Sequence, residues 1–322
     1  MNVKRILRSL LRVFDVCAAL LAIPSAIVLK GIRRLGIEYL PLSRRVLLLL
    51  GVFPVRNHYY EPLVDCRTLR RPLDTARVLP GIDWNAGGQL ALLARLNFGQ
   101  ELHDVPLRKP RGELEFYVNN ENFGPGDGEI WYSIIRHFKP ERIIEVGSGR
   151  STLMAQKAIA KNCLESKAQA CRHICIEPYE MPWLEQIDVQ VIRSKVEDVD
   201  RNLFETLREN DILFIDSSHV IRPQGDVLVE FLEILPQLKP GVVVHVHDIF
   251  SPRDYLAEWI CNRVRLWNEQ YLLEAFLTFN SKYKVICALN FLHHKYYDEL
   301  KSKCPFLSQE CEPSSFYMYK SC

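Results

Sequence analysis

Residues 145–152, which read EVGSGRST, constrain the fold of this 322-residue chain more than any other stretch. The run 142–146 is short and apolar, as buried strands are. Two glycines and a serine interrupt that run, and a segment with helical character begins at Ser151. A strand, a glycine turn and a helix N-terminus together present backbone N–H groups to a ligand at close range. The segment therefore predicts a nucleotide-type binding site at the end of a buried strand.

Strand and helix patterns alternate along the rest of the chain. Strands are predicted at 142–146, 173–176, 189–192, 212–216 and 242–247, with a final pair at 284–289 and 316–320. Helices are predicted at 129–138, 151–161, 198–209, 224–235, 253–279 and 291–301. Such alternation is typical of a parallel sheet covered by helices on both faces. The predicted fold class is α/β: a Rossmann-like, doubly wound, mostly parallel seven-stranded sheet with an antiparallel edge strand, after an N-terminal helical and irregular extension.

Acidic side chains follow four of the predicted parallel strands. Glu177 ends the second strand, Glu197 and Asp198 follow the third, and Asp216 and Asp248 end the next two. Ligands of parallel sheets bind beyond the carboxyl ends of the strands, so these acids are expected to face the ligand. An acid at the end of the second strand is placed to bind the two hydroxyls of a ribose.

This order of features resembles the class I S-adenosylmethionine-dependent methyltransferases. An E-x-G-x-G turn followed by the acid Glu177 carries the resemblance. The forms GSGRST, FIDSSH and GVVVHVHDIF are similar to the branch that contains small-molecule and sugar O-methyltransferases. The resemblance spans residues 116–320. An NAD-binding oxidoreductase is a poorer match, because Thr152 stands where the dinucleotide fingerprint has its third small residue.

The resemblance implies that S-adenosylmethionine binds at the glycine turn. Its methionine portion would lie along the turn, its ribose at Glu177 and its adenine near Glu197 and Asp198. The cofactor-binding residues implied are Glu145, Gly147, Ser148, Gly149, Ser151, Thr152, Glu177, Glu197 and Asp198. An alternative for Ser151, Thr152 and Asp198 is that each only caps the helix it precedes or begins.

Two strand ends also carry imidazoles, and the candidate catalytic residues are Asp216, His219 and His247. In the metal-dependent O-methyltransferases that the chain resembles, acids at these strand ends hold a divalent cation, which implies Asp216 and Asp248 as metal ligands. The position after Asp248 holds isoleucine, where those relatives carry a second acid or an amide. Three alternatives follow: a cation with His219 or His247 as replacement ligand, a metal-free site with one of them as general base, or a structural role.

The N-terminal region predicts a membrane surface as partner. Residues 1–12 are basic and amphipathic, and the apolar run 16–29, interrupted by Pro24, ends in further basic residues. Neither this run nor the run 46–53 reaches the roughly twenty residues that span a bilayer. A segment lying in the interface satisfies both basic flanks, although ordinary helices packed on the core are an alternative. Three regions are predicted: 1–50, a basic amphipathic segment that associates with membranes; 51–111, an ordered connector and lid; and 112–322, the methyltransferase domain.

The expected function is S-adenosylmethionine-dependent methyl transfer to an oxygen of a hydroxylated small molecule, with a sugar or lipid-linked glycan favoured. A net charge of +2 gives no reason to expect a nucleic-acid partner. The expected location is the cytoplasm, peripherally on the inner face of the cell membrane. The alternative is a non-catalytic, membrane-associated binding or scaffold protein with a methyltransferase-like fold. The sequence predicts no oligomeric state.

Overall fold

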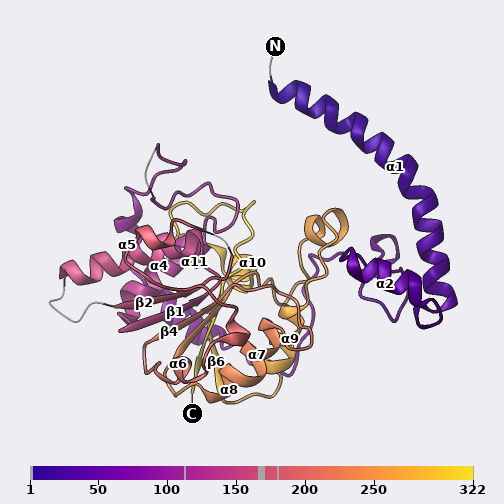
Figure 1. Cartoon of the computed structure of the whole chain (residues 1–322). Coiled ribbons are helices and arrows are strands. Elements are labelled where there is room, and N and C mark those ends of the chain that lie inside the picture. Colours follow the sequence, from indigo (N-terminus) through magenta and orange to yellow (C-terminus); the bar gives the residue numbers. More distant parts are fainter. Residues whose placement is uncertain (1–2, 112–113, 166–170, 180, 322) are drawn as a thin grey trace. The chain divides into compact units, whose positions relative to one another are not determined.

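The computed structural model describes residues 3–111, 114–165, 171–179 and 181–321. The chain forms two compact units, Met1–Leu69 and Arg70–Cys322 (Figure 1). The elements of the first unit are α1 (Val3–Leu35), η1 (Ile37–Tyr39), α2 (Pro41–Leu49) and η2 (Cys66–Thr68).

Helix α1 is longer than the sequence pattern predicts. It continues through Pro24 and bends along its length (Figure 1), as helices with an internal proline do. The segment Ile6–Leu35 has 30 residues and a mean hydropathy of 2.0 in its most apolar window, which is long and apolar enough to cross a membrane. This corrects the expectation that the apolar runs of this region are too short to span a bilayer.

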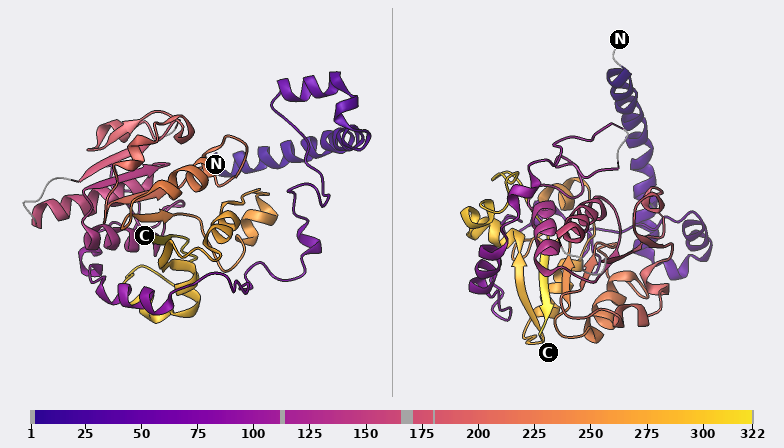
Figure 2. Two further views of the ribbon diagram at one scale, coloured as in Figure 1. Left: turned by 90° about the horizontal axis from the view of Figure 1, so that it is seen from below. Right: turned by 90° about the vertical axis from the view of Figure 1, so that its left-hand side faces the viewer.

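The second unit is built on a seven-stranded sheet of the order β3-β2-β1-β4-β5-β7-β6. Its strands are β1 (Arg142–Val146), β2 (Arg172–Ile176), β3 (Gln190–Ile192), β4 (Ile212–Ile215), β5 (Val243–Val246), β6 (Tyr283–Ala288) and β7 (Phe316–Lys320). The first five are parallel, and β7 runs antiparallel to both β5 and β6. The two C-terminal strands lie side by side in yellow tones in the right-hand view of Figure 2. This confirms the predicted fold class.

Helices cover both faces of the sheet. They include α3 (Ala86–Arg95), α4 (Asp127–Phe138), α5 (Arg150–Glu165), α6 (Asn202–Glu205), α7 (Asp226–Val229), α8 (Leu235–Gln237), α9 (Glu269–Leu277), α10 (Leu289–Lys295) and α11 (Tyr297–Lys301). Short 3-10 turns are η3 (Gly99–Leu102), η4 (Leu184–Gln186) and η5 (Val196–Asp198), and π-helical turns are η6 (Glu230–Ile234) and η7 (Glu258–Asn262). Figure 1 shows α4 and α5 on one face and α7, α8 and α9 on the other. Because both faces are covered, β4 and β5 are buried along their whole length.

Two predicted elements differ from those observed. The helix predicted over 198–209 is reduced to η5 and α6. The Arg201 guanidinium donates to the carbonyls of Val196, Glu197 and Val199, which holds the turn η5. The helix predicted over 253–279 is present only as η7 and α9, with the segment 263–268 between them. That segment forms part of the site described below.

Candidate functional site

The two glycines of the turn after β1 have different surroundings. Gly147 has φ +79°, and a Cβ there would come within 1.9 Å of the carbonyl oxygen of Asp216, so only glycine fits. A Cβ on Gly149 would meet only the Met181 side chain, at 4.0 Å. Gly149 therefore leaves room on the cavity side that the protein itself does not fill.

The start of α5 is fixed by hydrogen bonds within the turn. The Thr152 hydroxyl accepts from the Gly149 N–H at 3.0 Å and donates to the Glu145 carboxylate at 2.7 Å. The Ser151 hydroxyl also donates to Glu145, and its carbonyl accepts from the Trp131 indole at 3.1 Å. The turn thus holds its shape through Glu145, a residue of the strand beneath it.

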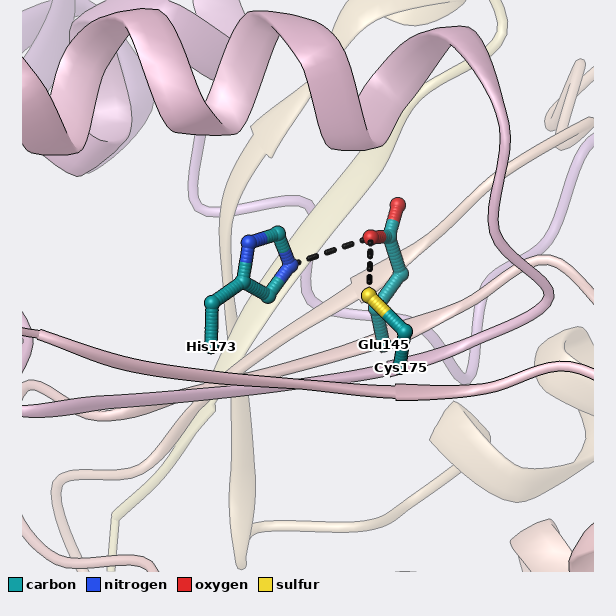
Figure 3. Close-up of side chains that lie close together, drawn as sticks. All are labelled: Glu145, His173 and Cys175. Carbon is teal, nitrogen blue, oxygen red and sulfur yellow. Dashed lines mark hydrogen bonds and ion pairs between the residues drawn. The ribbon is translucent and has the colours of Figure 1, made fainter. Parts of the chain in front are cut away.

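Glu145 lies on the face of the sheet that α5 covers, beside two side chains of β2 (Figure 3). Its carboxylate also accepts from the His173 ring at 3.0 Å and lies 3.6 Å from the Cys175 sulfur. Together with the two hydroxyls of α5, these contacts occupy the hydrogen-bond acceptor positions of the carboxylate. These three side chains lie close enough to one another to hold a metal ion, but both oxygens of the Glu145 carboxylate already accept hydrogen bonds from Ser151 and Thr152, and burial raises the pKa of the Cys175 thiol. The structure places Glu145 beneath the turn as a positioning residue, away from the cavity wall.

A cavity of about 680 Å³ opens beside the turn. The residues that line it come from the glycine turn, the strand ends, the loop before α4 and the segment after η7: Glu121, Asn122, Phe123, Gly147, Ser148, Gly149, Arg150, Ser151, Glu177, Met181, Asp216, His247, Asp248, Trp259, Arg263, Arg265 and Trp267. Most of the predicted site residues therefore share one cavity. Thr152 lies outside its lining and acts through the hydrogen bonds given above.

A smaller cavity of about 370 Å³ adjoins the first, since Gly147, Glu177 and Asp216 line both. The Glu177 carboxylate accepts from the backbone N–H of Ser148 at 3.3 Å and of Tyr179 at 3.0 Å. Among the residues predicted to contact adenine, Glu197 lines this cavity, together with Lys195 and Val196, and Asp198 lines neither cavity.

Acids and imidazoles converge at the ends of β4 and β5. His219 Nε2 lies 3.4 Å from one carboxylate oxygen of Asp216 and 3.4 Å from one of Asp248. His247 Nδ1 lies 3.4 Å from Asp216 and 3.5 Å from Asp248. The Glu269 carboxylate binds His219 Nδ1 at 2.8 Å, which directs Nε2 toward the two aspartates.

The backbone holds two of these side chains in an uncommon conformation. His219 and Asp248 both have φ +59°, in the left-handed region that residues with a Cβ rarely adopt. The His219 carbonyl accepts from the Asn268 N–H at 2.9 Å, and the Ser314 hydroxyl donates to Asp248 at 3.2 Å. A backbone conformation that costs free energy persists only where the surrounding contacts hold it in place. Such conformations are common at functional sites.

The charges of the cluster shift the pKa of each member. Burial alone would lower the pKa of both imidazoles, but neighbouring carboxylates outweigh it and raise the pKa of His219 and of His247 well above its ordinary value. Burial opposes ionisation of Asp216, yet the His247 charge and the hydrogen bond from His219 lower its pKa. Burial raises the pKa of Asp248 and of Glu269 despite their imidazole neighbours. The neighbouring carboxylates therefore favour the protonated form of both imidazoles.

His245, two residues before His247 on the same strand face, belongs to the core. Its ring stacks on Tyr317 at 4.1 Å and lies 5.0 Å from Trp131. Neither ring nitrogen has a hydrogen-bond partner within the described residues, and burial lowers the pKa of His245 well below its ordinary value. A neutral, packed imidazole is a structural side chain.

Several residues of the site carry no signal in the sequence. Glu269 lies at the start of α9, far along the chain from the imidazole that it binds. Trp259, Arg263, Arg265 and Trp267 fall in the stretch 253–279, which is predicted to be helical, whole or broken. The loop 121–123 differs from these residues, because the polar and aromatic segment 119–123 is predicted from the sequence as a candidate lid.

Comparisons with known proteins agree with this geometry. A family model described as a methyltransferase domain matches residues 144–249, from β1 to the residue after Asp248. An uncharacterized protein from Archaeoglobus fulgidus is 32% identical over 174 residues, which cover 50% of this chain and 76% of that protein.

Similar solved structures include the O-methyltransferase from Bacillus cereus in complex with SAH, 12% identical over 73% of this chain and 91% of that chain, with a TM-score of 0.37. Another is the MycE methyltransferase from the mycinamycin biosynthetic pathway in complex with Mg and SAH, 13% identical over 60% of this chain and 48% of that chain, with a TM-score of 0.33. Scores of this size carry no argument about function. The family match, the identity to the archaeal protein and the glycine turn at the carboxyl edge of the sheet lead to one conclusion: the chain belongs to the class I S-adenosylmethionine-dependent methyltransferase family.

Proposed function

We propose that this protein transfers the methyl group of S-adenosylmethionine to an oxygen of a hydroxylated small molecule, with a sugar or lipid-linked glycan as the favoured class. The observation that carries the proposal is that Asp216, His247 and Asp248 line the same cavity as Gly147 and Gly149. A turn suited to the cofactor and a cluster suited to a hydroxyl group thus share one space.

The two adjoining cavities suit the two ends of the cofactor. The smaller one, with Glu177 and Glu197, would take the adenosine, and the Glu177 carboxylate would bind the ribose hydroxyls. The larger one would take the methionine portion along Gly149. The buried Ser148 hydroxyl has no hydrogen-bond partner in the described part of the chain, so it is available to the cofactor.

The acid-rich cluster also suits a divalent cation. Asp216, His219 and Asp248 each offer a ligand atom, and these atoms lie within 4.8 Å of one another. The carboxylate that holds His219 Nδ1 orients the ring as carboxylates orient metal-binding histidines. An imidazole among three donors favours Mn²⁺ or Zn²⁺ over Mg²⁺. When bound, such an ion would lower the pKa of the acceptor hydroxyl.

The transfer requires that the acceptor oxygen, the methyl carbon and the sulfur be aligned, and it requires few chemical steps from protein side chains. The acceptor oxygen would form a bond to the methyl carbon while the carbon–sulfur bond breaks, its electron pair returning to sulfur as S-adenosylhomocysteine forms. The hydroxyl proton would leave to water. A histidine must be neutral both to act as a general base and to bind a cation, so a metal-free site with His219 or His247 as base stands beside the cation as the second arrangement.

The first test is calorimetric titration of the full chain with S-adenosylmethionine and with Mn²⁺. We expect Glu177→Ala to weaken cofactor binding about tenfold or more, because hydrogen bonds to a carboxylate are lost. We expect Asp248→Asn to weaken Mn²⁺ binding, while Asp188→Asn, at an exposed aspartate outside both cavities, changes neither titration.

Folded protein that binds no S-adenosylmethionine would refute the transferase proposal and favour the non-catalytic scaffold. Cofactor binding without Mn²⁺ binding would leave a metal-free site. In that case, formation of S-adenosylhomocysteine from a panel of hydroxylated sugars, followed against pH in His219→Gln and His247→Gln, identifies the base.

A further inference from the structure

One wall of the larger cavity lies outside the residues that match the family model. Trp259, Arg263, Arg265 and Trp267 belong to η7 and the segment between η7 and α9. The match ends at residue 249, and the glycine turn and the cluster at the strand ends all precede that residue. The residues of this wall and the loop 121–123 are therefore the parts of the cavity lining that the family match does not cover.

Arg265 is a cation held between two indoles. Its guanidinium carbon lies 4.5 Å from the Trp259 ring centroid and 4.0 Å from that of Trp267. The two indoles are 5.0 Å apart and nearly perpendicular, which fixes the position of the planar guanidinium. Its backbone N–H also bonds the Trp259 carbonyl at 2.9 Å.

The guanidinium of Arg265 has no acid within salt-bridge distance in the part of the chain that the structure describes. Its neighbour Arg263 pairs with Glu258 at 3.4 Å and is half exposed. Burial lowers the pKa of Arg265, although arginine stays charged at any physiological pH. A partly desolvated guanidinium with free N–H groups is the donor that a carboxylate or phosphate binds best.

This cation is close to the reacting end of the site. The Trp267 ring that packs on Arg265 also lies 4.2 Å from the His219 ring, between centroids. Arg150, which also lines the cavity, stands beside the glycine turn, and its guanidinium carbon lies 5.0 Å from the Tyr117 ring centroid. Arg150 is thus at the cofactor end, and Arg265 is at the acceptor end.

We propose that the acceptor is an anion: a hydroxylated ring compound whose carboxylate or phosphate binds Arg265, with its ring against the Trp259 and Trp267 indoles. This inference rests on the proposed methyl transfer and names the class of its acceptor. The hydroxyl to be methylated would lie toward Asp216 and Asp248, and the Trp267 ring would lie between it and the anionic group.

The test uses the purified full chain, saturated with S-adenosylhomocysteine, and three calorimetric probes: inorganic phosphate, D-glucuronate and methyl glucoside. We expect at least one anion to bind about tenfold or more tighter than the neutral sugar. Arg265→Met should abolish that preference and Arg265→Lys should restore part of it. The matched control Arg208→Met removes an exposed arginine outside the cavity and should change nothing. A preference for phosphate or for glucuronate tells which anion the site takes.

Equal binding of anion and neutral sugar, or an anion preference that survives Arg265→Met, would overturn the inference. So would a loss of S-adenosylhomocysteine affinity in Arg265→Met, because Arg265 would then serve the cofactor. Wild-type protein that binds no S-adenosylhomocysteine refutes the methyl transfer itself, a result distinct from each of these.

Discussion

At the scale of single residues, replacement of the two glycines of the turn should have different effects: one on stability and the other on cofactor affinity. Gly147→Ala places a Cβ against the Asp216 carbonyl at a positive φ, so we expect a loss of unfolding free energy on the order of 3 kcal/mol. Gly149→Ala meets no crowded atom, so we expect near-normal stability and about tenfold weaker binding of S-adenosylhomocysteine. Urea denaturation and calorimetry measure the two effects. Normal cofactor affinity in folded Gly149→Ala would mean that the cofactor does not approach this turn.

Single residues also show where sequence reasoning stops. Asp216 and Asp248 were predictable because the carboxyl ends of parallel strands meet at one edge of a sheet. The orientation of Glu145 was not, because a strand buried on both faces lacks the polar alternation that tells one face from the other. Glu269 was not predictable either, since its contact with His219 joins segments 50 residues apart. Long-range contacts of this kind leave no local pattern.

At the scale of elements, the first turn of α4 is hydrogen-bonded to the C-terminal part of the chain. Asp127 is its first residue, and its carboxylate accepts from the N–H groups of Ser314 and Ser315 at 2.9 and 2.7 Å. The buried Glu129 carboxylate accepts from the N–H groups of Gly126 and Phe306, both at 2.7 Å. This helix start thus links the loop before α4 to the segments before β7.

Burial raises the pKa of Glu129 from 4.5 to about 7, which makes the stability of this junction depend on pH. The unfolded chain loses this proton at lower pH than the folded protein, so the stabilisation is complete below the unfolded pKa and is lost as pH rises through the folded pKa. The difference amounts to about 3 kcal/mol. Relative to Glu129→Gln, the wild type should therefore lose about that much unfolding free energy between about pH 5 and about pH 8, measured by urea denaturation.

The matched control for this titration is Glu299→Gln, at an exposed glutamate of α11. It should follow the wild type at both pH values. A wild type and a Glu129→Gln variant with parallel pH profiles would mean that Glu129 ionises normally in the folded protein.

The elements predicted correctly are those whose apolar pattern is continuous and buried. The β1, β4 and β5 strands appear within two residues of their predicted ends, because each is an apolar run bounded by polar residues. After β3, helix propensity predicts a helix over 198–209, of which only η5 and α6 form.

At the scale of the whole molecule, the cavities and the candidate catalytic side chains all belong to the unit Arg70–Cys322. The other unit carries the apolar helix α1, in which large apolar side chains are exposed: Phe14 and Leu21 are each 71% exposed. Exposed apolar surface of this extent marks a contact with a membrane or another protein. We propose that α1 anchors the protein in a membrane, which would bring the site to acceptors held at the membrane surface.

The anchor predicts that the full chain floats with lipid vesicles and stays bound in about 1 M NaCl, where purely electrostatic attachment is screened. Leu21→Asp combined with Ile27→Asp should release it, because each acid costs about 3 kcal/mol at the centre of a bilayer. The matched control is Leu164→Asp, at an 84% exposed leucine of the second unit. Both variants should bind S-adenosylhomocysteine like the wild type, since neither position lines a cavity. Flotation of the double variant equal to that of the wild type would exclude α1 as the anchor, and release of the wild type by salt would assign the attachment to the basic residues instead.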